Sequence, residues 1–476
     1  MSLEAALGDG LDRLVQRHHR RRLTRTGWSA ALSPRGLELY AAGATPPRDG
    51  NDLQLHIDGA SALPAIARAI ASSRTNVLIA GWFASPDFRL QHDETAPPVR
   101  ELLATTATRI PVRLLLWAGP PAPAFRPTRR MVRAAATEFA AHPNVRVALD
   151  RRERTLHCHH EKIVVIDDEV AFVGGIDLTA LDGDRYDEVG HPRRPAIGWH
   201  DATAEIHGPL VDDVRDHVAA RWTATTGEAV AATRRNEPVG TVTAQFVRTV
   251  PEHIYDFLPH GEFTVLETYR RAIRSAQRLI YLENQFLWSP EIVSDLCGLL
   301  RTPPRDDFRL VLLLPARPNT GTDTTRGQLG RLLEADGDNK RLLATTIGPL
   351  GGGTSDSVYV HAKIGIIDDR WLTLGSANLN EHSLFNDTEA NIVTCDPTLV
   401  RQTRLRLWAE HLQRDTDDVG GDTTQLVDTL WRPIAEEQAH RLASGLKPTH
   451  PLRLLNGVSR HRERLRGPLG GLLVDG

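Results

Sequence analysis

Two stretches of the sequence carry the same chemically active residues, in the order His-x-Lys-x-x-x-x-Asp. The first set is His160, Lys162 and Asp167, and the second is His361, Lys363 and Asp368. Histidine can attack an electrophile or move protons near neutral pH, provided that its ring is oriented. On a strand, the lysine two positions later points to the same side and adds positive charge. If both sets face one cleft, one imidazole can attack while the other protonates the leaving group.

A phosphodiester is the electrophile that suits such a pocket. The cations stabilise charge on the non-bridging oxygens while the two histidines flank the phosphorus in line. Asp201 and Glu389, which open later strands, are candidates to accept the Nδ1–H of a histidine and to fix its tautomer. Asp167 and Asp368 are expected to hold the turn and its lysine rather than to contact substrate. This chemistry requires no metal ion and no other cofactor.

Each motif is followed by a glycine-containing turn, GGID in the first copy and GSAN in the second. These turns supply the supporting candidates Gly175, Asp177, Ser376 and Asn378. Backbone amides and the side chains of Ser376 and Asn378 could donate hydrogen bonds to phosphate oxygens.

An isolated His-x-Lys pair would usually be an accident in a chain with 20 histidines. The duplication argues against accident, and so does the choice of cation. Four of the 57 basic residues are lysine, and two of those four stand in the motifs. Because arginine is the ordinary cation of this chain, lysine at both positions indicates a requirement for a compact ammonium group.

The flanking sequence is also repeated. Apolar runs typical of strands precede the motifs in the same order, at residues 77–80, 112–117 and 145–148 and again at 279–282, 310–314 and 342–346. Helix-period stretches at 60–71 and 264–276 precede those runs. Each motif lies in a predicted hairpin, 162–175 or 363–375, and is followed by a strand and by a helix starting near Pro209 or Pro397.

We therefore predict an α/β protein with two homologous units, at residues 51–235 and 240–420, joined by a polar linker near 234–240. Residues 1–50 form a basic N-terminal extension, and residues 421–476 form a C-terminal extension. The repeated motif favours packing of the units about a pseudo-two-fold axis, so that a single chain holds both histidines. A monomer is then expected to carry the complete site.

The composition argues against several other classes of protein. The chain has 57 basic and 60 acidic residues, a net charge of −3, and 5% aromatic residues, so no nucleic-acid partner is expected. No apolar run reaches the roughly 18–20 residues of a membrane span, and no apolar segment follows the basic residues near the N-terminus. We expect a cytoplasmic protein without a secretory signal, in contact with membranes at most peripherally. Its three widely spaced cysteines fit a reducing compartment.

The two HxKxxxxD motifs with their turns resemble those of the phospholipase D superfamily. The string HHEKIVVIDDEVAFVGGIDL, followed by Arg185-Tyr186-Asp187 and by the WHD of residues 199–201, is similar to the first half of phosphatidylcholine-type phospholipases D. The strings YLENQF, YVHAKIGIIDD, GSANLNEHSL and NDTEANI resemble the second half. The resemblance covers about residues 53–412.

The resemblance implies two α/β/α sandwich units packed as an intramolecular pseudo-dimer that hydrolyses phospholipid headgroups. One histidine forms a phosphohistidine, the other protonates the departing alcohol, and water or a second alcohol resolves the intermediate. By resemblance, His160 is the nucleophile and His361 the general acid and then base. The sequence departs from the pattern at residues 179–184 and at Tyr186, where tryptophan is usual, so a choline preference does not follow.

Other interpretations stay open. A cardiolipin synthase would use the same six residues for transfer to a glycerol hydroxyl, although such resemblances usually include N-terminal membrane segments. A nuclease would also use them, and a non-catalytic relative would ordinarily have lost part of one motif. His157, Cys158, His159 and His160 could bind zinc, but the second copy has no equivalent cluster. The basic stretches at 13–25 and 460–466 could contact anionic lipids, and residues 351–353 could form a flap.

Overall fold

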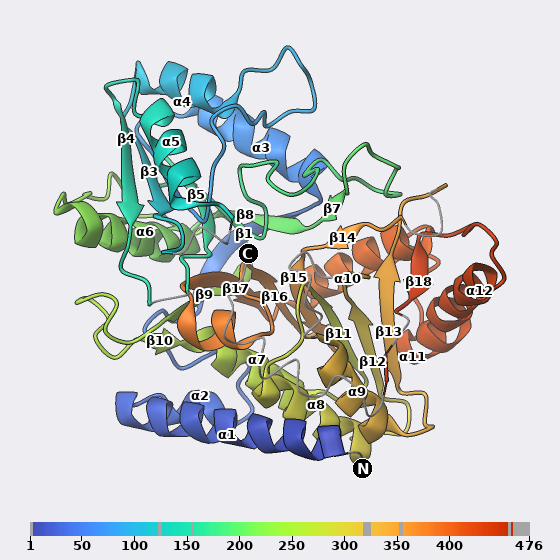
Figure 1. The fold of residues 1–476 in the computed structure, drawn as a ribbon. Helices are drawn as coiled ribbons and strands as arrows, with labels where there is room; N and C mark the ends of the chain where they lie inside the picture. Colours follow the sequence, from blue (N-terminus) through green and yellow to red (C-terminus); the bar gives the residue numbers. More distant parts are fainter. Residues whose placement is uncertain are drawn as a thin grey trace.

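The chain folds around one continuous mixed β-sheet in a computed structural model (Figure 1). The structure describes residues 3–121, 126–154, 157–317, 325–351, 356–455 and 458–459. Helices cover the faces of the sheet, which gives the layered α/β architecture expected from the sequence.

The strand order is the same in the two halves of the sheet. In the first half it runs β1 (Arg48–Ile57), β8 (Ala202–His207), β6 (Val170–Gly174), β5 (Lys162–Ile166), β2 (Val77–Gly81), β3 (Val112–Trp117) and β4 (Val145–Asp150). In the second half it runs β9 (Val242–Val250), β17 (Glu389–Thr394), β16 (Trp371–Gly375), β15 (Lys363–Ile367), β11 (Leu279–Asn284), β12 (Arg309–Leu313) and β13 (Leu342–Ile347). Short β10 (Glu262–Phe263) pairs with β9, and β18 (Leu452–Leu454) pairs with β13.

Strands β1 and β9 pair antiparallel and join the halves edge to edge. The repeated order agrees with two homologous units, and we propose 51–235 and 240–420 as their limits. The predicted strands and both predicted hairpins are present, with bounds within a few residues of the apolar runs.

The helices follow the duplication. In chain order they are α1 (Leu3–Thr26), α2 (Ser29–Leu32), α3 (Gly59–Ser72), α4 (Val99–Ala107), α5 (Arg129–Phe139), α6 (Leu210–Thr226), α7 (Thr264–Ser275), α8 (Pro290–Arg301), α9 (Thr325–Asp336), α10 (Pro397–Leu412), α11 (Thr423–Leu426) and α12 (Arg432–Ala443). Two π-helical turns, η1 (His382–Asn386) and η2 (Val427–Trp431), complete the set. Helix α6 follows Pro209, and α10 begins at Pro397 with Asp396 as its N-cap, as the proline positions predicted.

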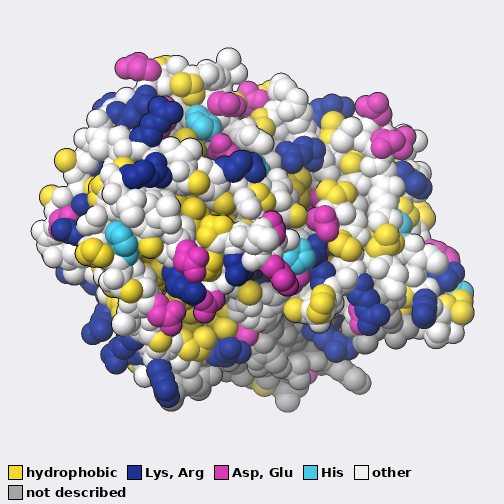
Figure 2. Space-filling view, turned by 90° about the horizontal axis from the view of Figure 1, so that it is seen from above, with side chains coloured by type: hydrophobic (Ala, Val, Ile, Leu, Met, Phe, Trp, Pro, Cys, Tyr) yellow, Lys and Arg dark blue, Asp and Glu magenta, His cyan; other side chains and the backbone are white. Residues whose placement is uncertain are grey.

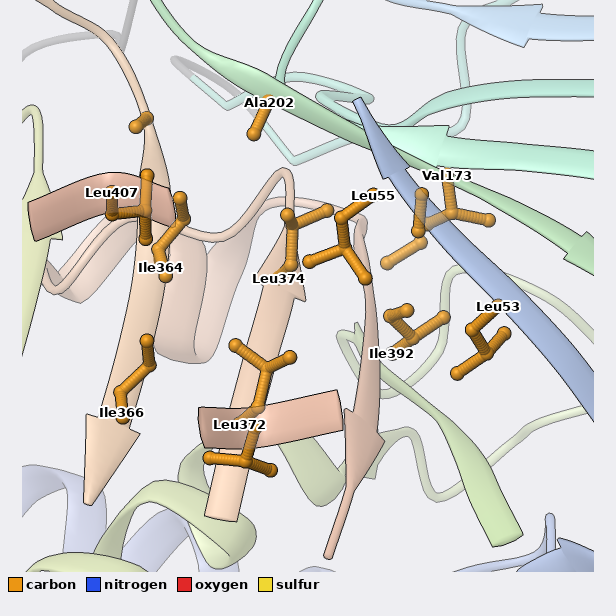
Figure 3. Close-up of a cluster of buried hydrophobic side chains, with 14 of the residues drawn as sticks. Leu53, Leu55, Val173, Ala202, Ile364, Ile366, Leu372, Leu374, Ile392 and Leu407 are labelled. Carbon is orange, nitrogen blue, oxygen red and sulfur yellow. The ribbon is translucent and has the colours of Figure 1, made fainter. Parts of the chain in front are cut away.

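Three large apolar clusters lie between these layers. One packs α3, α4 and α5 on the first half of the sheet, and a second packs α1, α2, α7 and α8 on the second half. The third is shared by both halves, and Figure 3 shows its side chains from β1, β6, β15, β16 and β17 meeting near Leu55, Leu374 and Ile392. Because this core includes strands and helices of both halves, it fixes one half against the other.

The motif hairpins turn through paired aspartates. Asp167 and Asp168 between β5 and β6 have φ of 57° and 52°, and Asp368 and Asp369 between β15 and β16 have φ of 53° and 50°. Two consecutive left-handed residues are what a tight type I′ turn requires, and aspartate tolerates that conformation. Each hairpin is therefore a short, rigid support for its histidine and lysine.

The basic N-terminal stretch belongs to a helix that packs on the second half. Its exposed face carries Arg13, Arg17, Arg20, Arg21 and Arg25, whereas His19 and Arg22 are buried. In α1, Arg22 is 4% exposed and bonds Glu252 at 2.8 Å, and His19 bonds Glu291 at the same distance. These groups are unavailable to a lipid surface. The basic residues at 460–466 and most of the proposed flap at 351–353 lie outside the described residues. Within the described ranges, the structure contains no helix that combines the length and the apolar character needed to cross a bilayer.

Candidate active site

The motif histidines lie where segments from the two halves meet. The amide N–H of His160 donates to the carbonyl of Thr388 at 2.9 Å, and that of His361 donates to the carbonyl of His200 at 2.8 Å. Short strands β7 (Trp199–His200) and β14 (Tyr359–Val360) pair in parallel beside them. The backbone of each motif is thus held by the opposite half of the chain.

Each motif histidine is bonded to a carboxylate from the other half. His160 Nδ1 lies 2.9 Å from Glu389 Oε1, and His361 Nδ1 lies 2.5 Å from Asp201 Oδ2. All four side chains are buried. The sequence identified both carboxylates as candidates without assigning either to a particular histidine. In the structure the pairing is crosswise, which means that each carboxylate bonds the motif histidine of the other half. This arrangement holds Nδ1 of each ring and directs Nε2 as the reacting atom.

The motif lysines reach back along their strands. Lys162 Nζ donates to the carbonyl of His160 at 2.7 Å and lies 3.2 Å from Asp177 Oδ2. Lys363 Nζ donates to the carbonyl of His361 and to Gln285 Oε1, the latter at 3.1 Å. Both ammonium groups therefore stay beside the imidazoles.

The motif aspartates do not hold the lysines, which corrects that part of the sequence interpretation. They lie at the far ends of the hairpins and bind the loops that enter the adjacent strands. Asp167 accepts from the amides of residues 74–76, and Asp368 accepts from those of residues 277–279. They contribute to the position of the hairpin, because each ties its turn to a second loop.

The turn residues act mainly on the carboxylates. Ser376 Oγ donates to Glu389 Oε2, and a side chain at Gly175 would overlap Asp201. Asn378 Nδ2 donates to Gln285 Oε1 at 3.3 Å. Ser376 thus orients Glu389, and Gly175 leaves the space that Asp201 occupies, so both act on the partners of the histidines.

Arg185 and Gln285 are site residues to which the sequence interpretation gave no role. The Arg185 guanidinium lies 3.3 Å from the centroid of the Trp199 ring, which is 4.5 Å from the ring of His361. Burial lowers the pKa of Arg185 to about 10, which leaves it charged at neutral pH. Both residues lie in strings that carried the family resemblance, RYD and YLENQF, so a signal for them was present.

The charges of both halves act on one centre. Burial, followed by Lys363, Arg185, Lys162 and His160, lowers the pKa of His361 well below its usual value. Because Lys162 and His160 contribute, the two motifs lie within electrostatic range of each other. Burial raises the pKa of Asp201 to about 6 and that of Glu389 well above the usual range. Lys363, Arg185 and Lys162 thus place positive charge around His361, which favours an anion there.

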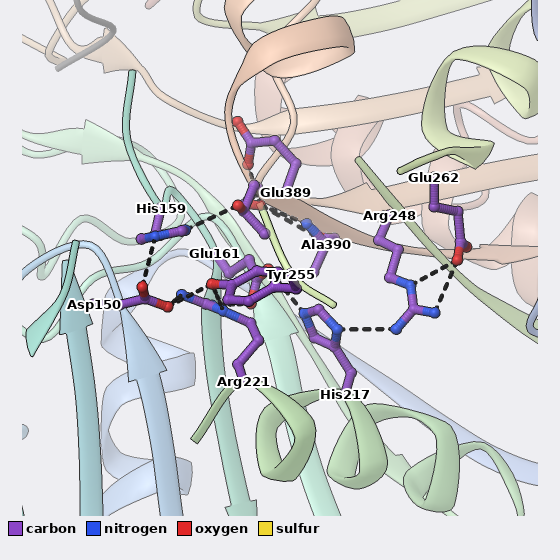
Figure 4. Close-up of polar contacts among 12 residues, drawn as sticks. Asp150, His159, Glu161, His217, Arg221, Arg248, Tyr255, Glu262, Glu389 and Ala390 are labelled. Atoms are coloured by element: carbon purple, nitrogen blue, oxygen red, sulfur yellow. Dashed lines mark hydrogen bonds and ion pairs between the residues drawn. The ribbon is translucent and has the colours of Figure 1, made fainter. Parts of the chain in front are cut away.

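A buried ionic network supports the first motif from the opposite face of β5 (Figure 4). Glu161, between His160 and Lys162, bonds Arg221 at 2.7 Å and His217 at 2.8 Å. His217 contacts Arg248 of the second half, and Arg221 also contacts Asp150, which lies 3.2 Å from His159. Alternate residues of this extended segment therefore place His160 and Lys162 on one face and the anchoring residue Glu161 on the other.

The four residues considered as a zinc cluster do not converge. His157 contacts His382, Cys158 contacts Asp387, His159 contacts Thr388, and His160 contacts Glu389. His157 also lies 3.3 Å from Asp387, the partner of Cys158, whereas His159 and His160 point to Thr388 and Glu389. Among the described residues, the sets of histidines and carboxylates that could hold an ion include neither of the motif histidines.

Comparisons with known proteins agree in one superfamily. The profile of the family described as "Cardiolipin synthase, PLD-like domain" matches residues 269–409. Phospholipase D A of Dictyostelium discoideum is 26% identical over 462 residues, and phospholipase D2 of Bos taurus is 24% identical over 469. These alignments cover 77% and 73% of this chain but only 36% and 49% of those relatives.

Two further similarities span more of the matched protein. Cardiolipin synthase B of Salmonella typhi is 26% identical over 376 residues, covering 76% of this chain and 80% of that relative. The crystal structure of phosphatidylserine synthase from Haemophilus influenzae Rd KW20 superposes with a TM-score of 0.53 at 13% identity, covering 85% of this chain and 97% of the other. At that identity, the superposition supports the fold alone.

Proposed function

The chain belongs to the phospholipase D superfamily, and from this premise we propose that it hydrolyses the headgroup phosphodiester of phospholipids. The single observation that carries the proposal is the crosswise pairing of two buried histidines with Glu389 and Asp201, each histidine beside its own lysine. This set provides an oriented nucleophile, an oriented acid and a pocket for an anion.

The proposed reaction has two steps. His160 Nε2 attacks the phosphorus, a nitrogen–phosphorus bond forms, and the bond to the headgroup oxygen breaks as His361 Nε2 gives that oxygen a proton. His361 then takes a proton from water, whose oxygen attacks the phosphohistidine, and phosphatidic acid leaves. An alcohol in place of water would yield a new phosphodiester. Glu389 stabilises the charge that develops on His160, as a triad carboxylate does.

Binding of the substrate favours the protonated form of His361, which the reaction requires as its acid. In the empty pocket, burial and the neighbouring cations keep the pKa of His361 low. A bound phosphodiester brings negative charge close to Lys162, Lys363 and Arg185, offsets their repulsion, and raises the pKa of His361. The proton donor therefore forms when the anion is present, which limits protonation to the productive complex.

A lipid surface is the proposed partner. Val189, Ile197 and Leu350 are 74%, 38% and 45% exposed aliphatic residues on loops that meet where Pro192 pairs with Leu350. Ile197 lies two residues before Trp199, whose ring contacts His361. Aliphatic side chains on loops beside the site could enter the lipid interface and bring the headgroup bond to the histidines.

A nucleic-acid substrate has less support. Figure 2 shows the molecule from above the view of Figure 1. Over the described part of this face, Lys and Arg side chains are scattered among Asp and Glu rather than gathered in a continuous band. A groove for a polyanion requires a row of phosphate contacts. The net charge of −3 points the same way.

Phosphatidyl transfer of the cardiolipin synthase type is the second candidate. The match to cardiolipin synthase B covers 80% of that relative, against 36% and 49% for the phospholipases D. Transfer and hydrolysis share the first step and differ in what resolves the phosphohistidine. The acceptor used in the second step decides between them.

One assay separates these activities. We would incubate the purified chain with vesicles of phosphatidylcholine, phosphatidylethanolamine and phosphatidylglycerol, with and without a primary alcohol, and with plasmid DNA in parallel. Headgroup release with formation of phosphatidic acid supports a phospholipase. Products formed only with an added alcohol or with phosphatidylglycerol support a transferase, and plasmid nicking alone would overturn the lipid proposal.

Variants connect the activity to the site. His160→Ala and His361→Ala should each abolish turnover, because either loss removes an obligatory partner. His207→Ala is the matched control, since His207 also bonds a carboxylate, Glu205 at 3.0 Å, but stands outside the site. Full activity in either motif variant would refute the assignment.

A further inference from the structure

A second buried cluster of histidines and carboxylates lies beside the candidate active site. Its members are Asp58 after β1, His191 and His200 from the segment that leads to β8, and Glu410 of α10. One ligand atom from each lies within 4.8 Å of the others, and all four residues are buried. Asp58, His191 and His200 belong to the first half of the chain and Glu410 belongs to the second, so the cluster links the two halves.

His191 is oriented as a metal-binding histidine. Its Nδ1 lies 2.8 Å from Asp187 Oδ2, and its Nε2 faces Glu410 Oε1 at 3.5 Å without a hydrogen-bond partner among the described residues. Metal-binding histidines usually donate one ring N–H to a carboxylate and present the other nitrogen to the ion. With Nδ1 protonated, Nε2 presents a lone pair to a carboxylate oxygen, so a cation or a proton must lie between them.

His200 repeats this arrangement. Its Nε2 lies 2.8 Å from Glu283 Oε2, and its Nδ1 lies 2.8 Å from Asp58 Oδ1. Nδ1 of His200 faces the cluster. If Nδ1 bound an ion, Glu283 would still accept the hydrogen bond from Nε2 and hold the ring. Asp58 Oδ1 also accepts from the amide of Asp201 at 3.0 Å, which holds Asp58 in place.

Two carboxylate oxygens point into the same space. Asp58 Oδ2 and Glu410 Oε1 are both buried, and neither has a hydrogen-bond partner within the part of the chain that the structure describes. Two carboxylates in one dry site cannot both stay ionised without a compensating positive charge. The unpartnered atoms of Asp58, His191 and Glu410 are the second indication that something binds here.

A cavity borders this cluster. A cavity of about 720 Å³ is lined by Glu410 itself and by direct neighbours of two other members, Ile57 beside Asp58 and Gly190 beside His191. Arg406 and Asp415 also line the cavity, so its wall is partly polar. The cavity therefore brings solvent next to Glu410 and to the segments that carry Asp58 and His191.

We propose that Asp58, His191, His200 and Glu410 bind one divalent transition-metal ion of the zinc class. Two imidazoles and two carboxylates form a four-ligand set that suits zinc better than magnesium or calcium, which prefer oxygen ligands. A separation of at most 4.8 Å allows the ligands to close around an ion bonded at about 2.0–2.2 Å. The ion takes no part in the reaction.

The metal would position the catalytic pair. His361 donates its amide to the carbonyl of His200, and Asp58 accepts from the amide of Asp201. Fixing His200 and Asp58 on an ion therefore fixes the backbone on both sides of the His361–Asp201 hydrogen bond. The site would also link α10 to the first half, which adds to the stability of the folded chain.

The test measures binding directly and does not depend on lipid turnover. The full chain, stripped with EDTA and dialysed, is titrated with ZnCl₂ against a chromogenic chelator, and bound metal is counted by mass spectrometry. We expect one tightly bound equivalent and a rise in Tm. Titration with CoCl₂ should give visible absorption bands of a four-coordinate site with nitrogen and oxygen ligands.

Variants decide whether the ion binds here. His191→Gln and Glu410→Gln should lose the bound equivalent, and Asp187→Asn, which removes an outer hydrogen bond, should weaken binding about 10- to 100-fold. His157→Gln is the control, because His157 belongs to a separate candidate group with His382 and Asp387. Wild-type affinity in both ligand variants would overturn the proposal.

Failure of the wild-type chain to retain any equivalent would overturn it without reference to variants. In that case a proton shared between Asp58 and Glu410 neutralises the cluster. If a ligand variant does not fold, Asp187→Asn and the cobalt spectrum of the wild type still give the answer.

Discussion

Asp201→Asn and Glu389→Gln should separate the roles of the two histidines through the leaving group. Each substitution preserves the size of the side chain and replaces a carboxyl group that can carry charge opposite an imidazolium by an amide that cannot. The affected hydrogen bond is to Nδ1 of His361 in the first variant and to Nδ1 of His160 in the second. A hydrogen bond to a charged group contributes about 1.5–3 kcal/mol. At about 1.36 kcal/mol for each factor of ten in rate, each variant should slow its own step about 10- to 150-fold.

The two steps respond differently to the substrate. Choline leaves as an alkoxide that requires a proton, whereas p-nitrophenolate leaves without one. First-turnover release of nitrophenolate, followed by stopped-flow absorbance, isolates formation of the phosphohistidine. Asp201→Asn should approach the wild-type burst on the nitrophenyl lipid while losing its full factor on phosphatidylcholine. Glu389→Gln should be slow on both.

Three results would contradict this reasoning. Equal losses of the two variants on both substrates would mean that the crosswise pairs do not divide the roles. A wild-type burst of Glu389→Gln on the nitrophenyl lipid would mean that His160 is the acid and His361 the nucleophile. Turnover of either variant at the wild-type rate would mean that the carboxylate replaced in it does not contribute to catalysis. Circular dichroism and Tm of each variant are the controls for folding.

Three further predictions concern the same region. Burial raises the pKa of Asp201 to about 6, above its usual 3.8, so the stability contributed by this carboxyl falls as pH rises between those values. The Tm of Asp201→Asn minus that of the wild type should therefore increase from about pH 4 to pH 7, by the equivalent of roughly 3 kcal/mol. A decrease in this difference would show that the folded state stabilises the ionised carboxylate. Gly175→Ala should lower kcat about as much as Asp201→Asn with the fold retained, because the added Cβ would overlap Asp201; steady-state kinetics check this, and wild-type kcat would contradict it. Val189→Asp with Leu350→Asp should reduce turnover of vesicles but not of a monomeric short-chain lipid, and equal loss on both would exclude a role at the interface.

The local parts of the fold follow from the sequence because they depend on neighbouring residues. Short continuous apolar runs identified the strands, and Pro397 marked the start of α10. The hairpin at Asp167 was expected from two short strands joined by a tight acidic turn, and in the structure Asp167 has the left-handed conformation that such a turn requires. The repeat of these elements was sufficient to expect two similar halves.

Long-range pairings were less accessible. The function of Ser376 was expected to be phosphate binding, whereas its hydroxyl holds Glu389. The basic residue Arg22 was expected on a solvated or lipid-facing helix, whereas it is buried against Glu252. In both cases the deciding partner lies in a part of the chain that spacing does not identify.

The sequence by itself determined which side chains can react, because the motif, its duplication and its choice of lysine are chemical facts written along the chain. Only the tertiary structure decided that His160 is oriented by Glu389 and His361 by Asp201. It also brought Asp58, His191, His200 and Glu410 together in a second site. The physical reason is that covalent spacing fixes neighbours along one strand, whereas contacts between halves depend on how the shared core packs the two halves against each other.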